Sequence, residues 1–270
     1  MQITADSLWS DLAAIRERKP LVHNITNYVV MNNTANALLA LDASPVMAHA
    51  ADEVEDMVSI AGALVINIGT LDSTWEPAMH RAAARARGIG VPIVLDPVGA
   101  GATPYRTDAV ARLLDTATPS VIRGNASEIR AVLAAGVGNT KGVDSSDTTE
   151  EAAPDAVALS KALGCVVCMS GEVDYIIDGD GGVLVRNGHA MMPRVTGLGC
   201  TASALCGAFL AVESSPPTAA AHAMLVMGIA GEVAAERAAG PGSLQLHFLD
   251  ALANLDRDDI ARRMRVEVRR

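Results

Sequence analysis

Ala63-Leu-Val-Ile-Asn-Ile68 is a short apolar run of the kind that forms a buried β-strand. A helix-type stretch follows it at about 74–87, and Pro92-Ile-Val-Leu95 then supplies a second apolar run. A strand, a helix and a strand in this order are typical of a β-α-β unit in a parallel sheet.

The same alternation continues on both sides of this unit. Further strands are expected at Leu21-Val22, Pro45–Ala48, Val121-Ile122 and Cys165–Met169. Helices are expected between the strands, at about 27–41, 52–60, 106–115, 126–134 and 151–163. The stretch Gly136–Asp155 is rich in Gly, Thr, Ser and acidic residues, and it is interpreted as a long surface loop.

The rhythm changes in the last third of the chain. Asp174–Ile177 and Val183–Arg186 flank Asp178-Gly-Asp-Gly-Gly, which predicts an antiparallel hairpin. From Gly199 to about Leu255 the pattern is helical, with breaks expected at Pro216-Pro217 and Gly240-Pro241-Gly242.

The fold class predicted by this pattern is α/β, with a central mostly parallel sheet flanked by helices and an antiparallel edge hairpin. At 270 residues the chain fits a single domain over 1–270. Half of the residues are apolar but only 3% are aromatic, so the core must consist of Ala, Val, Leu, Ile and Met, which suit close packing of helices on a sheet.

The charge of the chain bears on its partners. It has 21 basic and 31 acidic residues, a formal net charge of −10, and its arginines cluster only in the last few residues. Nucleic acid and anionic membrane are therefore poor partners. The first residues, MQITADSLWSDL, have acidic groups where a signal peptide needs basic ones. The apolar stretches Ala202–Val212 and Ala219–Ala230 are each shorter than the roughly 20 residues that span a bilayer, so we expect a cytoplasmic protein.

Cys165-Val-Val-Cys168 has the CxxC spacing of redox motifs. A redox pair lies at a helix N-terminus, which stabilises the thiolate. This one lies in a β-like run whose alternate residues face opposite sides of the sheet, so the structural interpretation is preferred. The six histidines have no spacing typical of a zinc site.

Polar residues follow two of the expected strands. Asp96-Pro-Val-Gly-Ala-Gly-Ala-Thr103 places a carboxylate and a glycine loop after the strand that ends at Leu95. Ligands of parallel sheets collect at this edge, although an Asp here is about as often a turn or cap residue. Arg123-Gly-Asn125-Ala-Ser-Glu128 follows the next strand. Asn125 and Glu128 can form a capping box, and the same pair beside Asp96 can also bind hydrated magnesium.

Thr196-Gly197-Leu198-Gly199-Cys200-Thr201 runs directly into an apolar helix. Successive amides at a glycine-rich helix start, together with the helix dipole, form an anion hole that suits a transferring phosphoryl group. The alternative is a glycine-containing turn that only starts the helix.

Together these three motifs resemble the hydroxyethylthiazole kinase family of the ribokinase-like superfamily. Val22-His-Asn-Ile-Thr-Asn27, Ala43-Ser-Pro-Val-Met-Ala48 and Gly171-Glu-Val-Asp174 resemble that family as well, and the resemblance extends over about residues 12–260. It implies a ribokinase-like fold, ATP-dependent phosphorylation of 4-methyl-5-(2-hydroxyethyl)thiazole in thiamine biosynthesis, Mg²⁺ as cofactor, and a homotrimer with the acceptor pocket at a subunit boundary.

The resemblance also implies roles for individual residues. Arg123 and Ser170, with Asn125 beside them, contact the nucleotide, and Asp96 and Glu128 organise magnesium. The thiazole is bordered by Asn27, Met47 and Gly197, and the catalytic anion hole consists of Gly197, Gly199 and Cys200. Ser170 stands where the family usually has Thr, and Leu198 where a smaller residue is commoner.

Cys200 stands where most ribokinase-like enzymes have an Asp that takes the proton of the attacking hydroxyl. A helix N-terminus lowers the pKa of a thiol and a nearby triphosphate raises it, so the sequence leaves the direction of the shift open. Positioning and charge neutralisation supply most of the rate in phosphoryl transfer. Cys200 is therefore expected to be a weak base.

Other functions remain open at this point. One is another kinase of the superfamily, such as a hydroxymethylpyrimidine kinase, or the related dehydratase, although Cys200 in place of Asp argues against most of these. Another is a nucleotide-binding sensor without catalysis, which would not require Asp96, Glu128 and Arg123.

Overall fold

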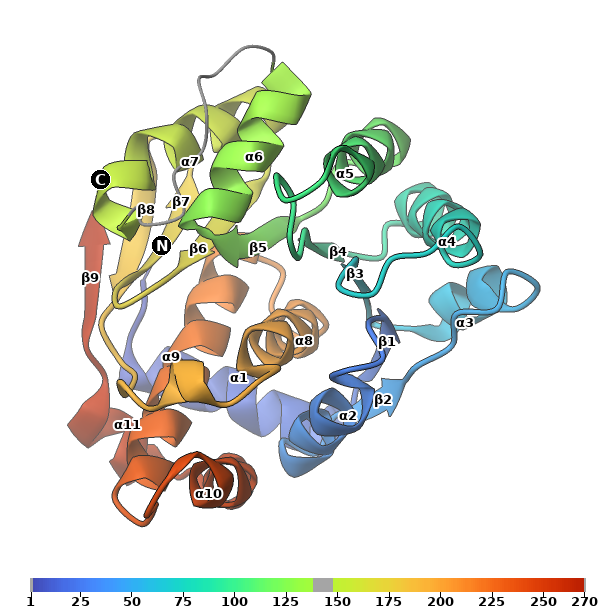
Figure 1. Cartoon of the computed structure of the whole chain (residues 1–270). Coiled ribbons are helices and arrows are strands. Elements are labelled where there is room, and N and C mark those ends of the chain that lie inside the picture. The colour runs from blue at the N-terminus through green and yellow to red at the C-terminus, as the bar shows by residue number, and fades with distance from the viewer. Residues whose placement is uncertain (1, 138–147, 270) are drawn as a thin grey trace.

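A computed structural model describes residues 2–137 and 148–269. In these residues all strands belong to one nine-stranded sheet with the order β2-β1-β3-β4-β5-β6-β7-β8-β9 (Figure 1). The strands are β1 (Leu21–Ile25), β2 (Ser44–Val46), β3 (Ala63–Asn67), β4 (Ile93–Asp96), β5 (Val121–Asn125), β6 (Val166–Ser170), β7 (Asp174–Asp178), β8 (Gly181–Val185) and β9 (Val266–Arg269). The strands from β2 to β6 are parallel, and β7, β8 and β9 continue the sheet in antiparallel pairing.

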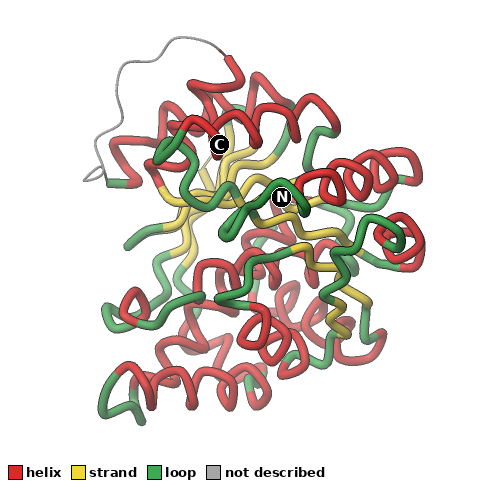
Figure 2. The backbone as a smooth tube through the Cα atoms, turned by 45° about the vertical axis from the view of Figure 1, so that its right-hand side comes forward, coloured by secondary structure: helices red, strands yellow, loops and turns green. Residues whose placement is uncertain are grey.

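Helices cover both faces of the sheet (Figures 1 and 2). One face carries α1 (Ala5–Arg18), α2 (Met31–Ala40), α8 (Leu198–Leu210), α9 (Pro216–Ala235), α10 (Pro241–Asn254) and α11 (Arg257–Arg263). The other carries α3 (Val54–Ile60), α4 (Glu76–Ile89), α5 (Pro104–Thr116), α6 (Ala126–Val137) and α7 (Thr149–Leu163). A short 3₁₀ helix, Met192–Arg194, precedes α8.

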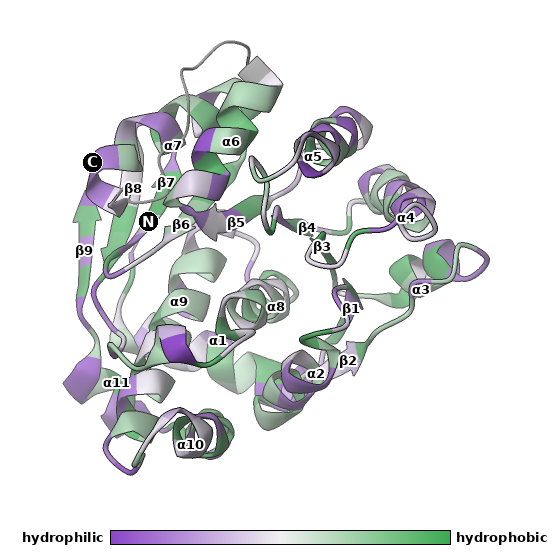
Figure 3. Ribbon diagram, viewed as in Figure 1, coloured by the Kyte–Doolittle hydropathy of each residue, from purple (hydrophilic) through white to green (hydrophobic). Residues whose placement is uncertain are grey.

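Each face of the sheet has its own apolar core. Figure 3 shows hydrophobic colour along β4, β7 and β8, and alternating hydrophilic and hydrophobic turns along α4 and α5. Cys165 belongs to the core under α7, whereas Cys168, three residues later, belongs to the core under α8 and α9. Both cysteines are free and buried, so the structural interpretation of the CxxC spacing is confirmed.

The mostly parallel sheet with an antiparallel edge hairpin is confirmed, and the expected helices and strands occur with shifted ends. The sequence prediction missed α1, α11 and β9, which lie outside the alternating pattern. The single domain over 1–270 stays a prediction, which the continuous sheet of the described residues supports.

The two proline breaks mark helix starts. Pro216 and Pro241 are the first residues of α9 and α10, where a proline loses no helical hydrogen bond. Because α9 begins at Pro216, it has 20 residues and is longer than the expected apolar stretch. Within the described chain it is the one helix with the length and hydropathy of a membrane span, and 83% of its apolar stretch is buried inside the fold, as in a core helix.

The prediction of a loop over Gly136–Asp155 is wrong at both ends. α6 continues to Val137, and α7 begins at Thr149, where a capping box between Thr148 and Glu151 starts it. The expectation for 138–147 lies outside the described residues.

Candidate active site

Polar side chains meet at the carboxyl ends of the central strands. The register aligns Asn67 of β3 with Asp96 of β4, and Asn125 of β5 with Ser170 of β6. Parallel strands end at the same edge of the sheet, so these polar residues lie together where the sequence predicts a ligand site.

Asp96 is the centre of the buried polar groups. It is 1% exposed, and its Oδ2 accepts hydrogen bonds from Asn67 Nδ2 and Ser203 Oγ, both at 2.7 Å. Its Oδ1 is buried and has no hydrogen-bond partner among the residues that the structure describes. Burial raises the pKa of Asp96 to about 6, against the opposing effects of Arg123 and of the Ser203 and Asn67 hydrogen bonds. A carboxylate with one unpaired buried oxygen is prepared to meet a cation.

Arg123 brings the opposite charge into the same place. Its side chain is buried, and its Nη2 donates to Ser170 Oγ at 2.6 Å. The other amino group lies against the start of α8, because a Cβ added to Gly199 would be 2.9 Å from Arg123 Nη1. Any larger residue at 199 would displace the guanidinium, so Gly199 is explained by this close approach.

The start of α8 matches the predicted anion hole in position. Gly197 caps the helix with φ of 87°, a left-handed conformation that favours glycine. Thr201 N donates to Gly197 O at 2.9 Å, so the three amides before it lie in the first turn and have no helical acceptor. Leu198 is partly buried and packs against the apolar core on the α8 face of the sheet.

Glu128 and Asn125 form a capping box, which is one of the two roles that the sequence leaves open for this pair. Asn125 Oδ1 accepts from Glu128 N at 2.9 Å, and Asn125 N donates to Glu128 Oε2 at 2.8 Å. Glu128 Oε1 also accepts from Gly99 N at 2.9 Å, which ties the glycine loop after β4 to α6. The cap is therefore confirmed, and it fixes the carboxylate near Asp96.

The donor set fits a magnesium ion carried by a nucleotide. In the described part of the chain no group of three or more His, Cys, Asp or Glu forms a metal cage. Mg²⁺ in phosphoryl-transfer sites needs only one or two carboxylates, with phosphate oxygens and water as its other ligands. Asp96, with its unpaired Oδ1, and Glu128 are two carboxylates at this place that could hold such an ion.

Cys200 lies next to this network. Asn27 Nδ2 contacts Cys200 Sγ at 3.5 Å and donates to Asn67 Oδ1 at 2.8 Å. Burial raises the pKa of the Cys200 thiol to about 11, and the negative charge of Asp96 acts in the same direction. The sequence leaves the direction of this pKa shift open, and in the structure the pKa of the Cys200 thiol is raised. A thiol with this pKa is neutral near pH 7, which counts against a base role.

The acceptor residues are only partly brought together. Asn27 follows β1 and joins the network of Cys200 and Asn67, and a Cβ on Gly197 would lie 2.8 Å from Val30 in the same region. Met47 follows β2, and its carbonyl oxygen is 2.9 Å from His49 Nδ1. Met47 therefore lies at the same edge of the sheet, outside the polar network of Asn27.

Sequence reasoning missed three buried residues of the site. Asn67 and Ser203 hold Asp96, and Asp174 accepts from Gly171 N at 3.1 Å beside Arg123. Burial raises the pKa of Asp174 to about 7, and the amide of Gly171 and the charge of Arg123 oppose the rise. A polar residue within an apolar strand or helix, as at 67 and 203, was the available signal.

A cavity of about 520 Å³ opens from this edge of the sheet. Asn125 and Ser170 line one side of it, and Thr149, the first residue of α7, lines another together with the cap residue Thr148. Tyr175 of β7, Arg186, which follows the last residue of β8, and Arg269 of β9 line the rest of it. The cavity thus begins at the residues next to Arg123 and extends outward across the antiparallel strands.

Relatives of known name match the chain almost from end to end. The hydroxyethylthiazole kinase family model matches residues 12–258. A relative from Syntrophus aciditrophicus named hydroxyethylthiazole kinase is 61% identical over 267 residues, which is 98% of both chains. The chain belongs to the hydroxyethylthiazole kinase family. Another member of this family, from Leptospira biflexa, is 56% identical over 94% of this chain and 95% of its own.

Solved structures agree with this assignment. A hydroxyethylthiazole kinase from Pyrococcus horikoshii OT3 has a TM-score of 0.91 and 44% identity, and the match covers 98% of this chain and all of that one. A pyridoxal kinase from Staphylococcus aureus, solved with AMP-PCP and pyridoxal, has a TM-score of 0.63 at 18% identity over 92% of this chain and 98% of that one. It shares the fold alone. The expected ribokinase-like fold, the membership in the hydroxyethylthiazole kinase family and the kinase class are confirmed.

Proposed function

We propose that the chain transfers the γ-phosphoryl group of ATP to the hydroxyl of 4-methyl-5-(2-hydroxyethyl)thiazole, in thiamine biosynthesis or salvage. The observation that carries this proposal is the contact between buried Arg123 and the first turn of α8 at Gly199, beside Asp96. A cation, a carboxylate and free helix amides at one point form a site for a transferring phosphoryl group.

The chain supplies three effects in this reaction. Arg123, with Ser170 and Asn125 nearby, orients the nucleotide phosphates, and the amides at Gly199 and Cys200 stabilise the charge of the transferring group. Asp96 and Glu128 would hold magnesium, which when bound neutralises phosphate charge. Cys200, with a pKa of about 11, contributes little as a base, so its proposed part is a helper beside the acceptor hydroxyl.

The acceptor pocket is proposed to form in a cytoplasmic homotrimer, with Asn27 and Gly197 from one subunit and Met47 from its neighbour. Two observations support a subunit boundary here: Tyr28 and Val29, which follow Asn27, are 62% and 60% exposed. Large apolar side chains at this exposure are suited to an interface. Sedimentation of the active enzyme tests the assembly, and a fully active monomer contradicts it.

The experiment for the function is an assay of ADP release with three arms. Hydroxyethylthiazole is the test acceptor, a hydroxymethylpyrimidine is the rival acceptor, and the third arm has none. The proposal expects magnesium-dependent ADP release with the thiazole, and one phosphorylated thiazole for each ADP formed. Equal ADP release without an acceptor, or preference for the pyrimidine, contradicts it.

A further inference from the structure

The outer half of the 520 Å³ cavity has a floor made by the antiparallel strands. Tyr175 of β7 pairs in register with Leu184 of β8, and Leu184 pairs with Glu267 of β9. Residues opposite one another in a sheet share a face, and so do residues two apart on a strand. Arg186 and Arg269 therefore belong to the same face as Tyr175, and both line the cavity.

These two arginines are half-exposed and share one counter-ion. The side chains of Arg186 and Arg269 are 48% and 54% exposed, and they lie 3.4 Å and 3.0 Å from oxygens of Glu267. An exposed ion pair of this kind stabilises a fold only slightly. Each guanidinium group has five N–H donors, so one shared carboxylate leaves several donors at the open end of the cavity available to a ligand. The flat faces of both groups can also stack on aromatic rings.

We propose that the purine and ribose of ATP lie over this floor, and that Arg269, assisted by Arg186, contacts them. The proposal rests on the proposed function, which places the triphosphate at Arg123. Because Ser170 touches Arg123 and also lines the cavity, the triphosphate leads from Arg123 past Ser170 into the cavity. The base and ribose then lie at its outer end, where ring nitrogens and hydroxyls can accept from guanidinium N–H groups.

The opposite orientation fits less well. With the phosphates on Arg186 and Arg269, the group to be transferred would lie at the half-exposed end, away from Asp96 and from the amides of α8. Glu267, Glu150 and Glu172 are also at or near this end, and their charges oppose a triphosphate there. A base and a ribose are uncharged and tolerate this mixture of charges.

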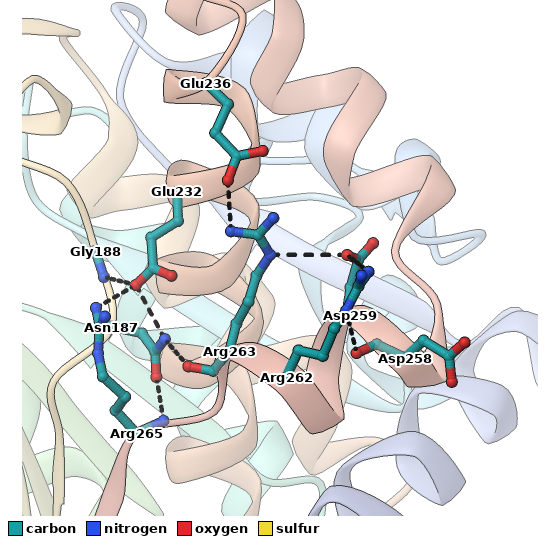
Figure 4. A network of polar contacts seen from close by, with 9 residues as sticks. All are labelled: Asn187, Gly188, Glu232, Glu236, Asp258, Asp259, Arg262, Arg263 and Arg265. Carbon is teal, nitrogen blue, oxygen red and sulfur yellow. Dashed lines mark hydrogen bonds and ion pairs between the residues drawn. The ribbon is translucent and has the colours of Figure 1, made fainter.

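The chain leading into β9 is held by a polar network (Figure 4). Asn187 Nδ2 donates to Glu232 Oε1 at 3.0 Å and to Arg263 O at 2.7 Å, and Arg265 N donates to Asn187 Oδ1 at 2.8 Å. Arg263 also pairs with Glu236 at 2.7 Å. These contacts fix the entry to β9 on α9, so Arg269 reaches the cavity from a strand with a defined position. The match of the family model to this chain ends at residue 258, before this strand.

The test compares Arg269→Ala with Arg262→Ala. Arg262 is a matched control because it is also near the C-terminus and pairs with a carboxylate, Asp259, at 2.9 Å, but does not line the cavity. Binding of ADP and of inorganic tripolyphosphate is measured by calorimetry for both variants and for the unchanged chain. The KM for ATP is measured at saturating thiazole.

The proposal expects Arg269→Ala to weaken ADP binding and raise the KM for ATP about three- to tenfold, the size of one lost contact from a partly exposed charged group. Tripolyphosphate binding should change less than about twofold, since it has no base or ribose. Arg262→Ala should match the unchanged chain in every measurement.

Two results overturn the proposal. One is ADP binding in Arg269→Ala equal to that in Arg262→Ala. The other is an equal loss of ADP and tripolyphosphate binding, which would assign the arginine to phosphate. If the unchanged chain fails to phosphorylate the thiazole, the proposed function fails by itself, while the two binding measurements still decide the role of Arg269.

Discussion

The cavity of about 520 Å³ and the buried residues beside it form a site whose two ends differ in how they hold charge. At the inner end, Arg123 is 9% exposed and donates to Ser170, and Asp96 is 1% exposed and accepts from Asn67 and Ser203. At the outer end, Arg186 and Arg269 are about half-exposed and share Glu267. Charges in a dry, fixed setting act more strongly than charges screened by water. The inner end is therefore suited to stabilise a transition state, and the outer end to bind.

The largest effect is expected from Arg123→Met, which removes the buried cation and keeps most of the side-chain length. We expect kcat to fall by about 10³-fold, as for loss of a main electrostatic contact to the transferring group. The measurement is kcat at saturating ATP and thiazole, with circular dichroism to check folding. Arg112→Met is the control, because Arg112 is an exposed arginine paired with Glu76. A folded Arg123→Met enzyme with kcat within threefold of the control contradicts the role of Arg123.

The next effect is expected from Glu128→Gln. The amide can keep one of the two hydrogen bonds to Gly99 and Asn125, but it loses the charge available to magnesium. Turnover should fall by about 10²-fold and require more magnesium, while thiazole binding changes little. Magnesium titrations of the rate test this, with Glu55→Gln, an exposed glutamate paired with Arg81, as control. Unchanged turnover and magnesium dependence would remove Glu128 from the site.

Replacement of Cys200 should have a moderate effect. Since the pKa of its thiol is about 11, Cys200 contributes little as a base, so Ala should lower the single-turnover rate by less than about 10²-fold, the low end of general-base contributions. Asp should be tolerated, because its carboxylate can take a proton at neutral pH. Single-turnover rates of the Ala, Ser and Asp variants against pH are the measurement. Complete loss of transfer in both Ala and Asp, with nucleotide binding intact, would show an essential role for the thiol.

Asp174→Asn is expected to have the smallest effect on the reaction. It should have a clear effect on the stability of the fold. Burial raises the pKa of Asp174 from 3.8 to about 7, so the folded chain holds this proton more tightly than the unfolded chain. Its contribution to stability is therefore present below pH 4 and is lost as the pH rises towards 7. Asparagine does not titrate, and its Oδ1 can still accept from Gly171 N.

The free energy of unfolding of Asp174→Asn should accordingly rise relative to the unchanged chain between pH 4 and pH 7, by at most about 4 kcal/mol. Urea unfolding at several pH values measures this difference. Glu172→Gln, an exposed acid on the same turn, is the control and should show no such trend. A pH-independent difference for Asp174→Asn would mean that its carboxyl titrates equally in both states.

The sequence predicted the inner end much better than the outer end. Asp96 ends β4, Arg123 lies near the end of β5, and Glu128 lies in the first turn of α6. These strands alternate regularly with helices, and polar residues at parallel strand ends are a local signal. Asn67 and Ser203 are local exceptions in apolar segments, and only the three-dimensional contact with Asp96 gives them a role. Arg269 could not be assigned because β9 pairs with β8 across more than 80 residues of sequence, and no local pattern encodes that pairing.

The most direct test of the division between the two ends is the rate of a single turnover at saturating ATP, measured by rapid quench with hydroxyethylthiazole for Arg123→Met and Arg269→Ala. We predict that Arg123→Met slows formation of the phosphorylated thiazole by about 10³-fold, even when every site holds nucleotide. Arg269→Ala should reach the rate of the unchanged chain once ATP is saturating. Equal slowing in both variants, or no slowing in folded Arg123→Met, would contradict the account.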